Sequence, residues 1–375
     1  MTDGQADKIK LQKLRWKGVR EHQPFIGPHT VHFDIANGCN VRCTTCWHHS
    51  PHLLPVHAPS SAWKRKQMEY STFCKIMDDL VELQGLQQII LSGMGDPSLN
   101  SSLIDMVEYA HRHHVGVTII TNLLQVDLPR LLSSPLSRTD GMLNLLVSVC
   151  GVTSDVWNAF HSASSGFDKL LGQLDILKQA NFLPKHVQVI NSQNYHELDQ
   201  MVRFAKTWPA KRINFKYASL KNGTESIALS PQEKRELKLE LIPRAQAVAA
   251  FNEIDTDLVA FNSQISDDDF RTAPMETVGC YMGTVYCRIT VDLELLYCCN
   301  TEVSVGFLDQ EHSFRALWLS DRYRELREKL ARKDFFESCQ QCGKFKQNLK
   351  WSQKIGALRA KGLVSTYTFD EAEYE

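Results

Sequence analysis

The chain has 375 residues, with 42 lysine and arginine residues against 43 aspartate and glutamate residues. This length can bury one large core and a smaller domain, and the balanced charge gives no general attraction to nucleic acid or membrane surfaces. No apolar run is as long as a transmembrane helix, and the charged N-terminus lacks the apolar segment of a signal peptide. We therefore expect a cytoplasmic protein without nucleic-acid or membrane partners. In a reducing compartment, eleven cysteines indicate metal or redox chemistry rather than disulfides.

Six apolar, β-branched runs alternate with amphipathic stretches along the chain. Such runs favour extended backbone, so we predict a strand for each, with room for a helix after it. Alternating strands and helices predict an α/β fold with a parallel sheet, either open or closed as a partial barrel, and ligands at the C-terminal strand ends. The predicted strands are residues 31–36, 87–93, 116–122, 143–149, 186–191 and 212–218, and two predicted helical faces carry Phe167, Leu170, Leu171, Leu174 and Leu177, and Leu198, Val202 and Ala205.

The loop after the first predicted strand carries Cys39, Cys43 and Cys46 in a C-x3-C-x2-C pattern. Polar neighbours leave little apolar surface for three buried structural thiols. A zinc site would need a fourth ligand, for which His48 or His49 is available, although zinc ligands usually come as separated pairs. The alternative is a [4Fe–4S] cluster bound through three irons, whose fourth iron is open to a substrate or cofactor. We favour this iron–sulfur interpretation.

This pattern, directly after a first strand and ahead of several βα units, resembles the radical S-adenosylmethionine (SAM) family. The resemblance covers about residues 25–220 and implies a partial (βα)6 barrel of the TIM type. It also implies that SAM fills the open position on the cluster. Reductive cleavage of SAM would then give a 5′-deoxyadenosyl radical that abstracts hydrogen from a substrate, while the protein supplies geometry and excludes water. A flavodoxin- or ferredoxin-type reductant is implied as the electron source.

Four further stretches resemble SAM-binding motifs of this family. "LSGMGDPSLN" resembles the G-E-P motif, and "TIITNLL" resembles the third-strand T-N-G without its glycine. "VSVCG" occupies the position of a Ser-x-Asp-Gly motif, with Cys150 in place of the acid, and "VQVINSQNYHEL" resembles the adenine-contacting fifth strand. No arginine for the SAM carboxylate is evident after the fourth strand. The resemblance thus implies cofactor-binding roles for Trp47, Gly95, Asp96, Pro97, Thr121, Asn122, Ser148 and Val189.

Six more cysteines follow residue 279. The stretch between Cys280 and Cys298 predicts a β-hairpin with Asp292 and Glu294 near its turn, and a helix with Tyr323, Leu326 and Leu330 on one face precedes a C-x-x-C motif. This order resembles the twitch type of the SPASM domain, which implies one auxiliary [4Fe–4S] cluster. Its implied ligands are Cys280, Cys298, Cys339 and Cys342, with Cys299 as an alternative to its neighbour and Cys287 as a spare or alternative. A zinc ribbon is the competing interpretation.

These features divide the chain into five expected segments. They are an N-terminal extension (1–24), a radical SAM core (25–225), a helix and linker (226–278), a twitch- or SPASM-like domain (279–345) and a basic segment with an acidic tail (346–375). The linker helix is expected to begin with Ser230 as N-cap and Pro231 in its first turn. Cys74 and the "HRHH" of residues 111–114 have structural interpretations as a core residue and a helix end. Cys150 is either a buried thiol or a hydrogen donor.

The expected function is SAM cleavage coupled to hydrogen abstraction from a small polar substrate such as a sugar, aminocyclitol or nucleotide derivative. The auxiliary cluster would accept or relay an electron. A radical SAM peptide maturase, with RiPP-type oxidation or cross-linking, ranks second because only about 30 residues precede the first strand, too few for an added recognition domain. A non-catalytic zinc or iron–sulfur binding protein ranks third, since it leaves "GMGDP" unexplained.

Overall fold

The computed structural model describes residues 3–139, 141–265, 275–299 and 303–360. The chain divides into two compact units. We call the unit of residues 33–70 and 90–272 the core unit, and the unit of residues 1–32, 71–89 and 273–375 the terminal unit. Part of the expected linker and the acidic tail lie outside the described residues. Across these ranges, no helix has both the length and the apolar character needed to cross a membrane.

The core unit is built on a sheet with the strand order β6-β5-β4-β3-β2-β1, to which β1 and β2 contribute their carboxyl ends. Strands β3 to β6 are parallel, and their register pairs Val117 with Leu143 and Lys185 with Arg212. All six predicted strands are confirmed, because buried apolar runs of this kind are typical of parallel sheets. The strands are β1 (Thr30–Asp34), β2 (Gln88–Ser92), β3 (Gly116–Thr121), β4 (Leu143–Ser148), β5 (Lys185–Ile190) and β6 (Arg212–Tyr217).

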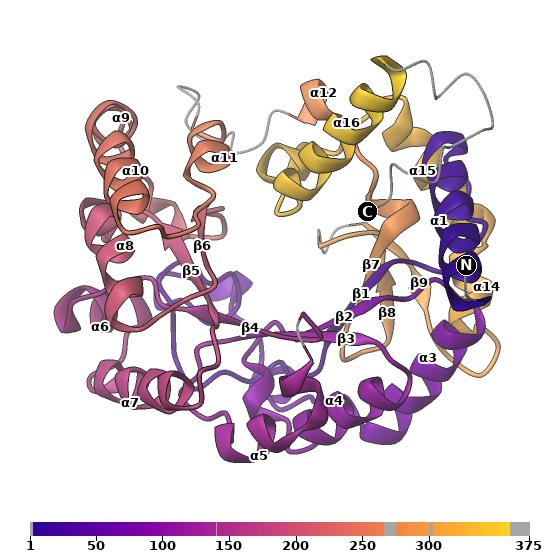
Figure 1. Ribbon diagram of the computed structural model, residues 1–375, viewed down its shortest axis with the longest axis horizontal. Helices are drawn as coiled ribbons and strands as arrows, with labels where there is room; N and C mark the ends of the chain where they lie inside the picture. Colours follow the sequence, from indigo (N-terminus) through magenta and orange to yellow (C-terminus); the bar gives the residue numbers. More distant parts are fainter. Residues whose placement is uncertain (1–2, 140, 266–274, 300–302, 361–375) are drawn as a thin grey trace. The chain divides into compact units, whose positions relative to one another are not determined.

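Helices connect successive strands of the core unit, and in Figure 1 α4, α5 and α7 lie along one side of β3 and β4. The predicted faces of α7 and α8 are buried, except that Leu171 is half-buried. The described strands form parallel βα units in a sheet without a closing pair, and the predicted partial (βα)6 fold is confirmed. The helices are α4 (Leu103–Arg112), α5 (Leu128–Ser133), α6 (Ser154–His161), α7 (Gly166–Gln179) and α8 (Leu198–Thr207), with short turns η1 (Pro55–His57), α2 (Ser61–Lys64), η2 (Pro97–Leu99), η3 (Pro135–Arg138), η4 (Tyr195–Glu197) and η5 (Thr224–Ile227).

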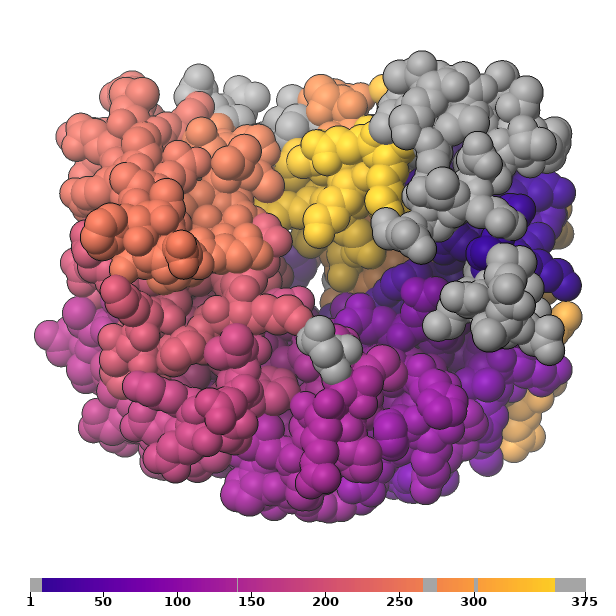
Figure 2. Space-filling view, viewed as in Figure 1, coloured from indigo at the N-terminus to yellow at the C-terminus, as the bar shows by residue number. Residues whose placement is uncertain are grey.

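The predicted linker helix is confirmed and contains one wide turn. It runs through α9 (Pro231–Glu236), a π-helical turn (Leu237–Leu241) and α10 (Ile242–Phe251), and it begins with a capping box between Ser230 and Glu233. The wide turn ends two residues before Pro243, which cannot donate a backbone hydrogen bond. The apolar side of α10 packs in the same core cluster as α8 and α11 (Leu258–Asn262), and Figure 2 shows these segments as one continuous surface.

The terminal unit contains an antiparallel sheet, β7-β8-β9, and several helices. The predicted hairpin is confirmed, with Leu293 at a φ of 63° in its turn. The predicted helix with Tyr323, Leu326 and Leu330 buried is also confirmed. The elements are α1 (Asp3–Glu21), α3 (Tyr70–Glu82, from the end of the core unit's first segment), α12 (Met275–Val278), α13 (Met282–Val285), β7 (Tyr286–Ile289), β8 (Glu294–Leu296), β9 (Ser304–Phe307), α14 (Phe314–Trp318), α15 (Asp321–Ala331), η7 (Glu337–Gln341) and α16 (Phe345–Ala360).

Candidate functional site

Cys39, Cys43 and Cys46 lie in the segment of residues 37–49, which follows β1 and which we call the cluster loop. Burial raises the pKa of Cys39 to about 12, and it raises the pKa of Cys43 and Cys46 as well. Neighbouring thiols add to the rise for Cys39 and Cys43, so the three side chains lie near one another. Three buried thiolates close to one another need compensating positive charge, which the irons of a cluster can supply. The donor set therefore fits an iron–sulfur cluster bound by three cysteines.

The cluster loop is held by hydrogen bonds to other loops and to α6. The backbone N–H groups of Arg42 and Thr44 donate to the carbonyl oxygens of His161 and Phe160, at 3.0 and 2.8 Å. The Thr44 hydroxyl also donates to the Gln193 side chain at 2.7 Å. These contacts fix the backbone on both sides of Cys43.

His49, one of the two histidines considered for zinc, has a structural contact. Burial lowers its pKa, and its Nε2 atom lies 2.8 Å from the carbonyl oxygen of Asn37. A neutral imidazole can donate from this nitrogen. His49 therefore joins the two ends of the cluster loop through this nitrogen.

Residues 93–97, which we call the Gly-Asp-Pro loop, lie directly against the cluster loop. The N–H groups of Gly95 and Asp96 donate to the carbonyl oxygens of Ala36 and Gly38, at 3.1 and 2.8 Å. A Cβ atom on Gly95 would lie 1.8 Å from the Gly38 oxygen, so only glycine fits this approach. The structure thus brings together two motifs that the sequence assigned to one cofactor.

Asp96 connects this loop to the end of β3. Its carboxylate accepts hydrogen bonds from the Thr121 hydroxyl at 3.0 Å and from the Asn122 N–H at 2.8 Å. The Asn122 side chain in turn donates to Asn40 in the cluster loop at 2.6 Å. Pro97 is buried at the start of η2. Four of the predicted SAM-binding residues, Asp96, Pro97, Thr121 and Asn122, therefore lie in one small network.

Ser148 and Val189 lie at the carboxyl ends of β4 and β5, and both are half-buried. Between them, Cys150 accepts a hydrogen bond from the Val189 N–H at 3.3 Å, and burial raises the pKa of Cys150 to about 12. Cys150 also lies close enough to Cys43 to raise its pKa. The sequence left two roles open for Cys150, a buried thiol or a hydrogen donor. Its position beside Cys43 comes from the tertiary structure and could not be read from the sequence.

Trp47 begins a segment, residues 47–54, that we call the strap. Its indole N–H donates to the Ser219 carbonyl oxygen at 2.7 Å, and the Lys221 ammonium lies 4.1 Å from the ring centroid. The Leu54 N–H donates to the Asn222 carbonyl oxygen at 3.0 Å. A Cβ on Gly223 would lie 2.4 Å from the His52 oxygen. The predicted cofactor residue Trp47 therefore joins the loop after β1 to the loop after β6.

A second group of thiols gathers in the terminal unit. Burial raises the pKa of Cys280 to about 12, and Cys339 and Cys299 add to the rise. Cys342 has a raised pKa for the same reason, with contributions from Cys299, Cys280 and Cys339. A Cβ on the neighbouring glycine, residue 343, would lie 3.2 Å from the Cys299 sulfur. The thiols of Cys280, Cys299, Cys339 and Cys342 thus form one mutually interacting group.

Cys298 and Cys287 are the other cysteines of this region, and they lie near buried tyrosines and Arg327. Cys298 helps to raise the pKa of Tyr297 and Tyr323, for which burial is the main cause. Cys287 is fully buried and lies near the Arg327 guanidinium. Cys280 also contributes to the raised pKa of Tyr297, so Cys298 lies near the thiol group as well, and Cys299 is the one of the two adjacent cysteines whose effect on the other thiols is seen directly.

In the described part of the chain, no three His, Cys, Asp or Glu side chains are arranged so that they could hold one metal ion. The thiolates of a four-iron cluster bind different irons. Single-ion ligands, in contrast, all lie within about 2.3 Å of one zinc.

Comparison with known proteins finds one matching domain family and several relatives that extend over most of the chain. Residues 280–343 match the family model of SPASM, an iron–sulfur cluster-binding domain. The chain is 27% identical over 319 residues to mycofactocin maturase MftC of Mycobacterium tuberculosis. The aligned residues cover 80% of this chain and 73% of that protein. It is 23% identical to the AdoMet-dependent heme synthase of Methanosarcina barkeri, over 80% of this chain and 85% of that protein.

Solved structures share the fold. SuiB of Streptococcus suis bound to S-adenosylmethionine has a TM-score of 0.64 at 14% identity and covers 93% of this chain and 78% of that one. The structure of anSMEcpe with bound AdoMet has a TM-score of 0.60 at 14% identity, over 92% of this chain and 97% of that one. Both likenesses agree with the partial barrel described above.

Proposed function

This chain is a radical SAM enzyme with a C-terminal SPASM domain, and we propose that it oxidises or cross-links a peptide. Its cofactors are a [4Fe–4S] cluster that binds SAM and an auxiliary [4Fe–4S] cluster. The observation that carries the peptide proposal is the similarity to a maturase over 80% of the chain. Further support comes from similar structures that hold peptides, namely SuiB with the precursor peptide SuiA and anSMEcpe with the Cp18Cys peptide. A peptide substrate thus has more support than the small polar substrate that the sequence favoured.

We assign the SAM cluster to Cys39, Cys43 and Cys46 and the contacts with SAM to the surrounding loops. Cys39, Cys43 and Cys46 would hold this cluster, which would supply the electron for reductive cleavage of SAM. The residues of the chain fix the position of that chemistry. Asp96 holds the Gly-Asp-Pro loop against β3, and Gly95 lets that loop approach the cluster loop closely. The proposed SAM contacts are Gly95, Asp96, Pro97, Thr121, Asn122, Ser148 and Val189, with Trp47 acting through the strap.

We assign the auxiliary cluster to Cys280, Cys339, Cys342 and Cys299, with Cys299 replacing the Cys298 expected from the sequence. Their mutual effects on pKa support this set. An auxiliary cluster suits an oxidation because it can accept or relay the electron that leaves the substrate radical. A flavodoxin- or ferredoxin-type protein would supply the first electron.

The test of the radical SAM site is anaerobic reconstitution of the wild type and of a Cys39→Ala/Cys43→Ala/Cys46→Ala variant, followed by dithionite reduction. We expect about eight irons in the wild type and about four in the variant, with 5′-deoxyadenosine formed only by the wild type. Cys74→Ala is the matched control because Cys74 is a half-buried cysteine on α3, in the other unit. Zinc in place of iron, or intact clusters without 5′-deoxyadenosine, would contradict this assignment.

The substrate class is tested by deuterium transfer. Deuterated peptide pools and deuterated sugars or nucleotides are offered separately to the reconstituted enzyme with SAM, and the mass of 5′-deoxyadenosine is measured. We expect deuterium from peptides, together with peptide products that have lost two hydrogen atoms or gained a cross-link. Transfer from a sugar or nucleotide pool alone would restore the small-substrate hypothesis.

A further inference from the structure

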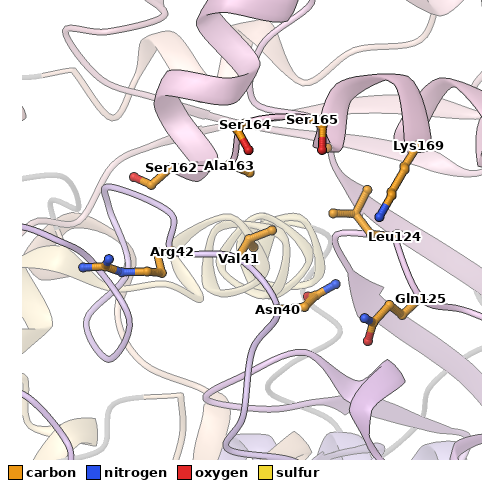
Figure 3. A pocket seen from close by; sticks show the side chains of 11 residues that line it. Asn40, Val41, Arg42, Leu124, Gln125, Ser162, Ala163, Ser164, Ser165 and Lys169 are labelled. Carbon is orange, nitrogen blue, oxygen red and sulfur yellow. The ribbon is translucent and has the colours of Figure 1, made fainter.

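A cavity of about 360 Å³ lies beside the cluster loop in the core unit. Figure 3 shows its lining, which comes from the cluster loop (residues 40–42), the loop after β3 (124–125), the turn between α6 and α7 (162–166) and Lys169 on α7. Its volume falls within the range of small-ligand sites. All of these segments follow carboxyl ends of strands or begin the next helices, where βα folds bind ligands.

The side chains that line this cavity are cationic or uncharged. Arg42 and Lys169 contribute two positive charges, and no carboxylate is among the lining residues. Within the described ranges, neither cation forms an ion pair. In Figure 3 the ends of Lys169, Gln125 and Asn40 lie on one side of the cavity, and Arg42 lies on the other. Lys169 is the cation that lies with Gln125 and Asn40, and Arg42 adds positive charge at the opposite edge of the cavity, so both favour an anionic ligand.

Further hydrogen-bond donors line the same cavity. Ser162, Ser164 and Ser165 present hydroxyl groups from the turn between α6 and α7, and Gln125 presents an amide. Ser165 precedes the first residue of the 14-residue helix α7, yet its side chain makes no capping hydrogen bond. Serine at this position usually caps the helix. These hydroxyl and amide groups are therefore available to a ligand with several acceptor oxygens.

We propose that this cavity binds an oxyanion, either the carboxylate of an acidic peptide or a phosphate group. Guanidinium, ammonium and hydroxyl groups together recognise such oxygens through charge-assisted hydrogen bonds. The inference goes beyond the proposed function, because it requires neither SAM cleavage nor a particular reaction. Bound ligand would contact residues 40–42, which separate Cys39 from Cys43, so this site lies next to the cluster-binding segment.

The test is isothermal titration of the full-length reconstituted protein at low salt with two probes, inorganic phosphate and a blocked tetraglutamate peptide. We expect at least one probe to bind, and we expect Arg42→Gln/Lys169→Gln to weaken its binding about tenfold or more. The matched control, Lys75→Gln/Arg235→Gln, removes two exposed cations elsewhere and should change binding less than about twofold. Arg42→Lys/Lys169→Arg should retain binding.

The two probes separate the sources of the oxyanion. Binding of phosphate identifies a phosphate-bearing ligand, and binding of tetraglutamate alone identifies an acidic peptide. Failure of both probes to bind, or equal weakening by the control variant, would overturn the proposal. Iron content and circular dichroism of each variant show whether it is folded and loaded. Formation of 5′-deoxyadenosine is recorded separately, so failure of the proposed enzymatic function is distinguishable from failure of this site.

Discussion

The Thr121 hydroxyl lies 3.0 Å from each carboxylate oxygen of Asp96, and the two residues join the Gly-Asp-Pro loop to the end of β3. Asp96 is 3% exposed, so its hydrogen bonds have little competition from water. It occupies the position at which the related motif has glutamate. The shorter side chain is fully engaged within the protein, which indicates that it positions the loop.

Asp96→Asn should therefore weaken SAM binding about tenfold or more and lower the free energy of unfolding by about 2 kcal/mol, because an amide nitrogen would face donors that now meet a carboxylate oxygen. Equilibrium dialysis of SAM with the reconstituted variant and denaturant unfolding measure the two effects. Asp105→Asn is the control. Asp105 lies on α4 and forms an exposed ion pair with Arg130 of α5. Unchanged SAM affinity in Asp96→Asn would remove Asp96 from the cofactor site.

The assignment of Cys299 gives a second prediction. Cys299→Ala should lose about four irons after reconstitution, whereas Cys298→Ala should keep its full iron content, because the structure places Cys299 with the other three thiols. Iron and sulfide analysis with electron paramagnetic resonance of the reduced protein measures this. Cys287→Ala, which alters a fully buried cysteine of the same unit, controls for general damage. Loss of iron in Cys298→Ala alone would restore the ligand set expected from the sequence.

Acid stability gives a third prediction. His186 is fully buried, its two ring nitrogens have no hydrogen-bond partner in the described part of the chain, and burial lowers its pKa from 6.5 to about 4. In the unfolded chain the His186 imidazole binds a proton below about pH 6.5, whereas in the folded chain it binds one only below about pH 4. Stability should therefore fall as pH decreases through this window, by at most about 3 kcal/mol for this group.

His186→Leu should reduce this loss, because leucine fills the space beside Phe204 without a group to protonate. Unfolding temperatures at several pH values between 7.5 and 5 measure the slope for each protein. His57→Gln, at an exposed position in η1, should keep the wild-type slope. Equal slopes in His186→Leu and the wild type would show that other groups, such as His161, dominate the acid response.

The sequence predicts the strands and the first cysteine group well because both are local patterns. Residues 143–148 are mostly apolar, with Leu143, Leu145 and Val147 buried, which suits a strand of this sheet, and Cys39, Cys43 and Cys46 belong to one short loop. The choice between Cys298 and Cys299 is different. Successive residues of an extended chain point to opposite sides, and the β8–β9 pairing has an irregularity between Leu295 and Leu296. Spacing alone cannot decide which of two adjacent cysteines faces the other thiols.

Contacts between loops that are distant in the sequence are a second feature of the candidate site that the sequence does not reveal. Trp47 and Ser219 are separated by 172 positions, and their hydrogen bond depends on the placement of β1 and β6 in the same sheet. Gly223 lies beside the strap with a φ of 107°, a backbone conformation that other residues rarely adopt. Nothing in the spacing of glycines identifies this position, because the requirement comes from the His52 carbonyl oxygen.

Gly223→Ala should release the strap. The added Cβ would lie 2.4 Å from the His52 oxygen and 2.9 Å from the Leu54 nitrogen, and alanine would also be strained at this φ. We expect the free energy of unfolding to fall by about 2 kcal/mol and hydrogen exchange in residues 47–54 to accelerate. Gly172→Ala on α7 is the matched control, because nothing lies within 4 Å of its added Cβ and alanine favours a helix. Faster exchange confined to the strap in Gly223→Ala, with slower or unchanged exchange in Gly172→Ala, would show that this contact holds the loops after β1 and β6 together. If the strap exchanges equally in both variants, Trp47 and Lys221 suffice to hold it.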